Sequence, residues 1–200
     1  MKEKTLQESG GKPEESCSVW EQIRRGDKKA FAALFESSSD RLYRYGTKFV
    51  NDNELVKDCI QELFTRLYQN RENLPGVENP IFFLFTLLRH ILIDALRKKD
   101  KLVYLSPEEL SFHISIIWDQ DGEEAEDEDE SIREQFNAVV ALLSERQKEA
   151  IYLRFKAGLS YDEIAGLLGI NYQSARNLIH RSIEKIRSQM GLNLFLILIA

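Results

Sequence analysis

The segment 143–187 constrains the fold most, because it carries successive helix-start signals separated by glycines. Ser144 and Ser160 are each followed, three residues later, by a glutamine or a glutamate. This is the capping-box spacing, in which the hydroxyl and the longer side chain satisfy free N–H groups of the first helical turn. Gly169 follows the second apolar stretch, where a left-handed glycine ends a helix at little steric cost. The spacing predicts three helices: one from 145 to a stop at Gly158, one over 161–168 and one from 172 to about 189.

The last of these helices has one apolar face and one polar face. Its apolar residues recur at intervals of four, four and three, as expected for one buried side, namely Ala175, Ile179, Ile183 and Ile186. Its first turns carry hydrogen-bonding side chains, which a helix needs to read base edges in the DNA major groove. Two helices joined by a tight glycine turn, the second polar outside, are typical of a helix-turn-helix, although a helical hairpin with a solvated face has the same pattern. The candidate DNA-binding residues are Asn171, Tyr172, Gln173, Ser174, Arg176, Asn177, His180 and Arg181.

The charge of the chain is unevenly distributed. The net charge of −6 is unusual for a DNA-binding protein. Between Asp119 and Glu134 there are ten acidic residues and one basic residue, whereas residues 139–190 hold eight basic and five acidic residues. The predicted DNA-binding part is therefore mildly basic, and its affinity for DNA alone should be modest because phosphate contacts supply much of the binding energy. The acidic run itself predicts a solvated, flexible linker.

The N-terminal half also has helical periodicity. The apolar residues between Leu55 and Tyr68 form one stripe, with Asp58, Gln61 and Glu62 on the opposite face. The segment 81–99 begins with an apolar run too short to cross a bilayer and ends in basic residues, which suit the C-terminal end of a helix dipole. We therefore predict an all-α fold, with two small helical domains joined by a flexible acidic linker and the helix-turn-helix in the second. The expected divisions are a disordered lead (1–18), a first helical domain (19–101), the acidic linker (102–137), the helix-turn-helix domain (138–190) and an apolar tail (191–200).

Several functional classes lack support in the sequence. Cys17 and Cys59 form no paired motif, which is consistent with a reducing cytosol. No stretch of about 18 apolar residues exists, so we expect no membrane span. The three histidines are far apart, and no glycine-rich phosphate loop occurs. We therefore expect no catalytic residues, no metal, no cofactor, no small-molecule substrate and no enzymatic activity.

Two segments of the first domain carry a family resemblance. Residues 52–68, DNELVKDCIQELFTRLY, are similar to the D-x-x-x-A-x-D-x-x-Q-E-x-F segment of bacterial RNA polymerase sigma factors. Residues 79–99, NPIFFLFTLLRHILIDALRKK, are similar to the N-P-x-x-W-L-x-x-I-A-R-N-x-x-I-D-x-x-R segment of the same proteins. The stretches RRGDKKAF and LSERQ…GLSYDEIAGLLGI also fit. Over about 20–101 and 139–187 the chain resembles a small sigma-70-family member of the extracytoplasmic-function (ECF) type.

The resemblance implies a promoter-specificity subunit that binds core RNA polymerase and initiates transcription in the cytoplasm. It implies docking on the β′ coiled coil through Asp58, Gln61 and Glu62, a contact of the second domain with the β flap, and recognition of the promoter −35 element by the helix-turn-helix. Melting of the −10 element falls to the loop 70–79 and the helix after it. The implied −10 contacts are Phe83, Arg89, His90, Arg97, Lys98 and Lys99. Because anti-sigma factors often hold this family inactive, an anti-sigma factor is a further implied partner.

Three residues depart from the family pattern. Phe83 stands where Trp is usual, which keeps an aromatic surface but loses an indole N–H donor. His90 stands where Asn is usual, at a position tied to the flipped −10 base, and Leu178 replaces a common basic residue of the recognition helix. The main alternative function is a transcription activator that binds DNA through its helix-turn-helix without polymerase. Such activators usually begin with a strand-rich sensor domain, whereas this chain begins with helices. A protein–protein adaptor that uses the acidic run is a further alternative.

Overall fold

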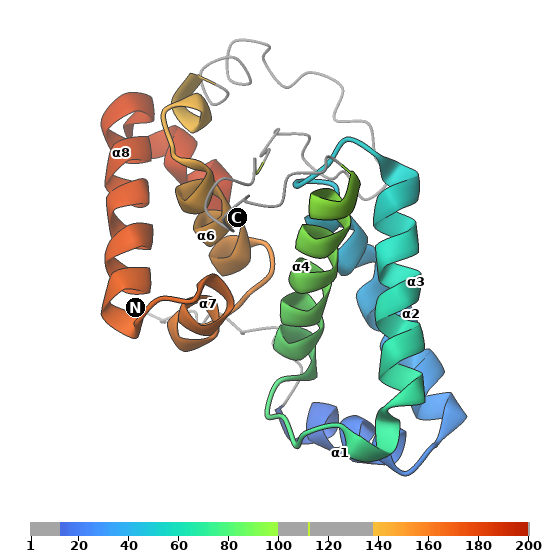
Figure 1. Ribbon diagram of the computed structural model, residues 1–200. Helices are drawn as coiled ribbons and strands as arrows, with labels where there is room; N and C mark the ends of the chain where they lie inside the picture. Colours follow the sequence, from blue (N-terminus) through green and yellow to red (C-terminus); the bar gives the residue numbers. More distant parts are fainter. Residues whose placement is uncertain (1–12, 100–111, 113–137, 200) are drawn as a thin grey trace, which may run out of the picture.

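The computed structural model describes residues 13–99, 112 and 138–199, and within these ranges all regular structure is helical (Figure 1). The all-α prediction is confirmed. A helical turn at residues 138–141 precedes α6. Among the described residues, no helix combines the length and the apolar character that a membrane span requires. The elements are α1 (Pro13–Arg24), α2 (Lys28–Gly46), α3 (Asn53–Gln69), the 3-10 turn η1 (Arg71–Asn73), α4 (Pro80–Lys99), α6 (Glu145–Phe155), α7 (Tyr161–Leu168) and α8 (Tyr172–Ile199).

Residues 13–99 form an N-terminal module in which α2, α3 and α4 pack side by side and α1 crosses one end (Figure 1). Its core combines aliphatic side chains such as Leu42, Leu63 and Leu88, at 0% exposure, with buried aromatic rings such as Trp20 and Phe85. The helix starts follow the sequence signals, because Asp27 and Asp52 accept N–H groups of the first turns of α2 and α3. This packing therefore fixes the positions of α4 and of the polar side of α3.

Helix α1 begins at Pro13, earlier than the end of the predicted disordered lead at residue 18. Proline is favoured in the first helical turn because it lacks an N–H that would be unsatisfied there. Two glutamates follow it in the sequence, and acidic residues are favourable in the first turn of a helix because of its dipole. The lead prediction is thus wrong for residues 13–18, and residues 1–12 lie outside the described residues.

Residues 138–199 form a C-terminal module of α6, α7 and α8 (Figure 1). Helix α8 continues to Ile199, so the predicted apolar tail is a continuation of this helix over residues 191–199 and not a separate segment. The tail is rich in leucine and contains no proline, which agrees with helical propensity. The predicted linker lies outside the described residues except for Phe112.

The two modules share one hydrophobic core. Helix α4 contacts α7, and the Arg41 guanidinium donates to the Ala157 carbonyl oxygen at 2.7 Å. Phe112 is 1% exposed and lies against Tyr45 and Phe49 of one module and Tyr152 of the other. The two predicted helical domains are therefore present, but they are packed against each other, which the sequence did not predict.

Candidate nucleic-acid and polymerase surfaces

The turn between α7 and α8 has the geometry that the sequence predicted. Ser160 accepts the Glu163 N–H at 3.3 Å, and the Glu163 carboxylate accepts the Ser160 N–H at 2.7 Å, which completes a capping box. Gly169 has a φ of 65°, in the left-handed region that glycine adopts without a Cβ clash. Asn171 Oδ1 accepts the Ser174 N–H at 2.8 Å and caps α8. The predicted caps are confirmed.

The polar side of α8 faces solvent from its first residue. Ala175 and Ile179, at 0% exposure, fix the opposite side of the helix in the core. Gln173 donates to Asn177 at 3.0 Å, so these two side chains are held together on the outer surface. All eight candidate DNA-binding residues are exposed: Asn171, Tyr172, Gln173, Ser174, Arg176, Asn177, His180 and Arg181. The structure thus places them on one continuous accessible side, as a helix in a major groove requires.

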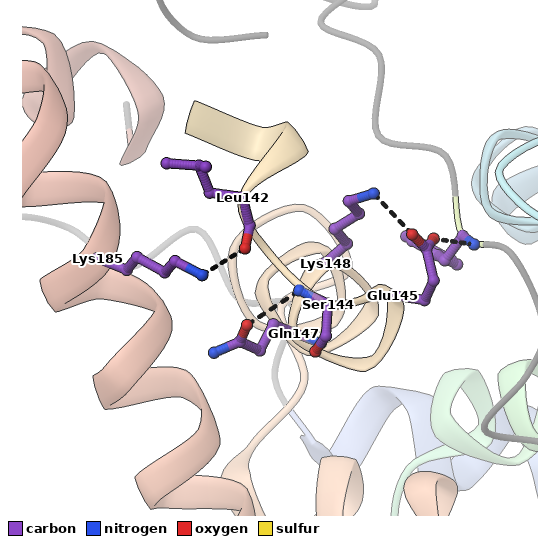
Figure 2. Close-up of polar contacts among 7 residues, drawn as sticks. Leu142, Ser144, Glu145, Gln147, Lys148 and Lys185 are labelled. Atoms are coloured by element: carbon purple, nitrogen blue, oxygen red, sulfur yellow. Dashed lines mark hydrogen bonds and ion pairs between the residues drawn. The ribbon is translucent and has the colours of Figure 1, made fainter. Parts of the chain in front are cut away.

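Polar contacts join α8 to the turn before α6, and α6 to α7 (Figure 2 shows the first). Ser144 forms a capping box with Gln147 at the start of α6, as predicted. The Lys185 ammonium of α8 donates to the carbonyl oxygen of Leu142, just before that cap. Arg146 donates to the Leu168 carbonyl oxygen at the end of α7 at 2.8 Å. These contacts tie the three helices to one another, so the exposed side of α8 has a fixed orientation.

The candidate polymerase-binding residues lie on the exposed side of α3. Asp58, Gln61 and Glu62 all face solvent, whereas Val56 and Leu63 on the opposite side are fully buried. Glu62 is paired with Arg66 one turn later, with both side chains about half exposed. Such solvent-screened pairs add little stability, so these side chains remain available to a partner.

An aromatic groove beside this face was not predicted. It lies between α2 and α3, has a volume of about 710 Å³, and includes Gln61 in its lining. Phe35 is 43% exposed and packs its ring edge against Phe64 at 4.8 Å between centroids. Phe31 precedes Phe35 by four residues on α2, and Tyr68 follows Phe64 by four residues on α3. The rings of Phe31 and Tyr68 contact each other, so the four aromatic side chains form one row. The signal in the sequence is this repeated i, i+4 aromatic spacing on neighbouring helices.

The candidate −10 residues do not share one face of α4. Phe83, His90 and Arg97 are spaced by seven residues and therefore lie near one side of the helix. The Phe83 ring packs edge-on against Trp20 at 5.3 Å, and His90 is exposed. Lys98 is also exposed, whereas the side chain of Lys99 lies outside what the structure describes. Arg89, by contrast, is 7% exposed and points toward α6.

Arg89 belongs to a buried polar cluster that joins the two modules. Its Nε lies 2.8 Å from one carboxylate oxygen of Glu149, and its Nη2 lies 3.3 Å from the other. The Tyr45 hydroxyl donates to the same carboxylate at 2.7 Å. Burial raises the pKa of Tyr45 well above its usual value, and the Glu149 charge raises it further. Burial alone would lower the pKa of Arg89, but hydrogen bonds and the charge of Glu149 raise it, so the guanidinium stays protonated.

No group of three His, Cys, Asp or Glu side chains in the described ranges is placed to hold a metal ion. Two family models match the two modules separately. The model described as Sigma-70 region 2 matches residues 34–102, and the one described as Sigma-70, region 4 matches residues 133–186.

The chain belongs to the sigma-70 family. It is similar to the RNA polymerase sigma factor CarQ of Myxococcus xanthus, with 28% identity over 172 residues that cover 86% of this chain and 95% of CarQ. It is also similar to the ECF RNA polymerase sigma factor SigW of Bacillus subtilis, with 27% identity over 175 residues that cover 84% of this chain and 93% of SigW. These relatives are sigma factors, which are not enzymes.

Two solved structures have the same fold. CnrH, in complex with the cytosolic domain of CnrY, superposes with a TM-score of 0.58 at 16% identity and covers 86% of this chain and 95% of its own. The sigma factor RpoE from Bartonella quintana, in complex with the anti-sigma factor NepR, superposes with a TM-score of 0.59 at 19% identity and covers 82% of this chain and 99% of its own. The two-module helical fold is therefore shared with CnrH and with the sigma factor RpoE.

Proposed function

We propose that this sigma-70-family chain is an ECF-type sigma factor that binds core RNA polymerase, directs it to specific promoters and helps to melt the start site. The observation that carries the proposal is the presence of two accessible surfaces of different chemistry in one chain. One is the polar side of α8, and the other is the polar side of α3 with its aromatic groove. A transcription activator that acts without polymerase needs only the first of them.

In this proposal the C-terminal module reads the −35 element. The exposed side of α8 enters the major groove, with Gln173, Arg176 and Asn177 at base edges and Arg181 at a phosphate. The N-terminal module receives the −10 element on α4. Phe83 supplies a surface for an unstacked base, while His90 and Arg97 lie one and two heptads further along the same side. Stacking on aromatic rings and cation–phosphate attraction are the forces by which proteins hold single strands.

The partners follow from the same surfaces. The α3 face, with Asp58, Gln61 and Glu62, is proposed to bind the β′ coiled coil of the polymerase, and the C-terminal module the β flap. The protein would act in the cytoplasm, where RNA polymerase works. An anti-sigma factor is proposed as a regulator, a proposal supported by the complex of the structural neighbour RpoE with the anti-sigma factor NepR.

Run-off transcription with purified core polymerase and genomic DNA fragments tests the proposal. The chain should make core enzyme start at a defined set of sites that share −35 and −10 sequences. Glu62→Lys should abolish binding to core enzyme, because it places a cation where the docking face is acidic. Glu21→Lys is the matched control, since Glu21 lies on α1 of the same module, is 49% exposed and is paired with Arg24, much as Glu62 is 48% exposed and paired with Arg66.

Failure to bind core enzyme, or to start transcription anywhere, would contradict the proposal. Equal pull-down of core enzyme by the Glu62→Lys variant and the parent would refute the docking face alone. Tight, sequence-specific binding of duplex DNA without polymerase would instead favour the activator.

A further inference from the structure

Trp20 of α1 is a buried residue to which the proposed function gives no role. Its side chain is 1% exposed, and α1 lies outside residues 34–102, the range that the Sigma-70 region 2 model matches. Tryptophan combines a large apolar surface with one polar N–H, and a buried N–H needs a hydrogen-bond acceptor. The neighbours of this side chain therefore show what α1 holds in place.

The indole N–H of Trp20 reaches the loop between α3 and α4. Its Nε1 donates to the carbonyl oxygen of Pro75 at 2.8 Å, across 55 residues of sequence. Pro75 and Gly76 are exposed, and a Cβ at Gly76 would meet no atom within 4 Å, so the outer side of the loop is open there. Figure 1 shows α1 beside this loop, in agreement with the contacts between α1 and η1. The hydrogen bond thus ties an exposed loop to a buried side chain of the core.

The ring of Trp20 also supports the residue that is proposed to stack on an unpaired base. The Phe83 ring packs edge-on against it, with 5.3 Å between the centroids and 65° between the ring planes. Because phenylalanine has no polar side-chain atom that could fix its orientation, the position of this ring depends on such packing. One buried side chain therefore contacts both parts of the proposed −10 surface, the loop and the stacking ring.

The two ends of the loop are fastened separately. At its start, Arg71 donates to the Tyr68 carbonyl oxygen at 2.9 Å, and its guanidinium lies 4.8 Å from the centre of the Tyr68 ring. At its end, Asn79 Oδ1 accepts the Ile81 N–H at 3.0 Å and caps α4. Pro75 lies midway between Arg71 and Asn79 in the sequence. The bond from Trp20 therefore acts on the middle of the loop.

We propose that Trp20 is a positioning residue for −10 recognition, whose indole holds the middle of the 70–79 loop and the Phe83 ring in the arrangement that receives an unpaired −10 base. This role rests on the −10 function of the loop and of α4 under the proposed function. Trp20 acts through these neighbours, because its own side chain is buried. Without the N–H the loop samples other conformations, and the apparent affinity for the cognate −10 sequence falls with the fraction of molecules in the competent one.

Trp20→Phe is the direct test, because it keeps an aromatic side chain but removes the donor. Core polymerase carrying each variant transcribes three competing templates in one mixture. These are a promoter found by run-off mapping, a copy with its most sensitive −10 base replaced, and a copy with its most sensitive −35 base replaced. Two ratios are measured: initiation at the intact promoter relative to the −10 copy, and relative to the −35 copy. A variant that is merely less stable lowers initiation at all three templates by one factor, so neither ratio changes.

Ser37→Ala is the control, since it removes an exposed side-chain hydrogen bond, to the Ala33 carbonyl oxygen, on α2 of the same module. Trp20→Phe should lower the −10 ratio about two- to tenfold, the factor that one neutral hydrogen bond corresponds to, and leave the −35 ratio at the parent value. Ser37→Ala should leave both ratios at the parent values. An unchanged −10 ratio in Trp20→Phe, or an equal fall of both ratios, overturns the proposal. If Trp20→Phe does not fold, benzothienylalanine incorporated at position 20 decides in its place, since it keeps the shape of tryptophan with sulfur instead of the N–H group.

The same assay separates this role from the proposed function. A parent protein with which core polymerase initiates nowhere overturns both. A parent that initiates with clear −10 and −35 preferences, beside a Trp20→Phe protein with the same −10 ratio, overturns the positioning role alone and leaves the proposed function intact.

Discussion

The crossing of α2 and α3 offers a test of the packing that supports the side of α3 proposed to bind polymerase. Gly46 is the last residue of α2 and is buried. A Cβ at this position would lie 2.6 Å from Val56 Cγ1 of α3, which real Cβ contacts do not reach. Val56 is 0% exposed and cannot swing into solvent. Gly46→Ala should therefore force the two helices apart.

The magnitude follows from two opposing effects. Overpacking a close-packed core costs about 1–3 kcal/mol, and the gain in helix propensity offsets at most about 1 kcal/mol. The expected loss of unfolding free energy is thus about 1–2 kcal/mol, or a fall in Tm of about 2–8 °C for a chain of this size. Val56→Ala alone should also destabilise, by about 1–3 kcal/mol, because it removes two buried methyl groups.

Urea unfolding followed by circular dichroism measures both effects. The double variant should be more stable than the sum of the single losses predicts, with a coupling energy of about 1–2 kcal/mol, because the clashing methyl is gone. Strictly additive losses, or a Gly46→Ala protein as stable as the parent, would show that the helices do not approach as described and would refute the reasoning.

The remaining predictions concern Arg176, Cys59 and Ser160. Arg176→Ala should weaken −35 recognition by about 1–3 kcal/mol if the guanidinium makes a bidentate base contact, and an unchanged footprint of the polymerase complex would show that it does not. Burial raises the pKa of the Cys59 thiol from 9.0 to about 11, helped by Glu62 and Asp58, so in a Cys17→Ser background it should resist iodoacetamide at pH 8 until urea is added. Because folding favours the protonated thiol, the contribution of Cys59 to the free energy of unfolding is complete below pH 9.0 and is lost as the pH rises to about 11. A Cys59→Ala protein should lack that pH dependence of stability. Ser160→Ala should cost about 1 kcal/mol in chemical unfolding by removing the α7 cap, and no change would mean that the capping box contributes nothing.

Local features of the sequence predicted the helix-turn-helix well, for a physical reason. The caps at Ser144, Ser160 and Asn171 act within three residues of themselves, so the spacing alone determines them. The polar side of α8 followed from the period of its buried residues. The exposure of the candidate DNA-binding residues could therefore be predicted without knowledge of the rest of the fold.

Contacts across the two modules could not be predicted in this way. Arg89 and Glu149 are 60 residues apart, and each fits a solvated position when its own helix is considered alone. Phe112 lies in a segment that we expected to be a tether, yet it is among the most buried aromatic residues described. Such contacts depend on how two independently formed surfaces match, and hydrophobic periodicity carries no information about that. The aromatic groove was missed for the same reason, since its two halves come from different helices.

The length of α8 has a practical consequence for experiments on this protein. It runs without interruption for 28 residues, so its two ends are about 40 Å apart at 1.5 Å per residue. A fluorophore or affinity tag joined after Ala200 would therefore sit far from the end of the helix that we propose to enter the DNA groove. Labelling there should report the position of the C-terminal module while leaving sequence readout intact, whereas a label near Tyr172 would obstruct it.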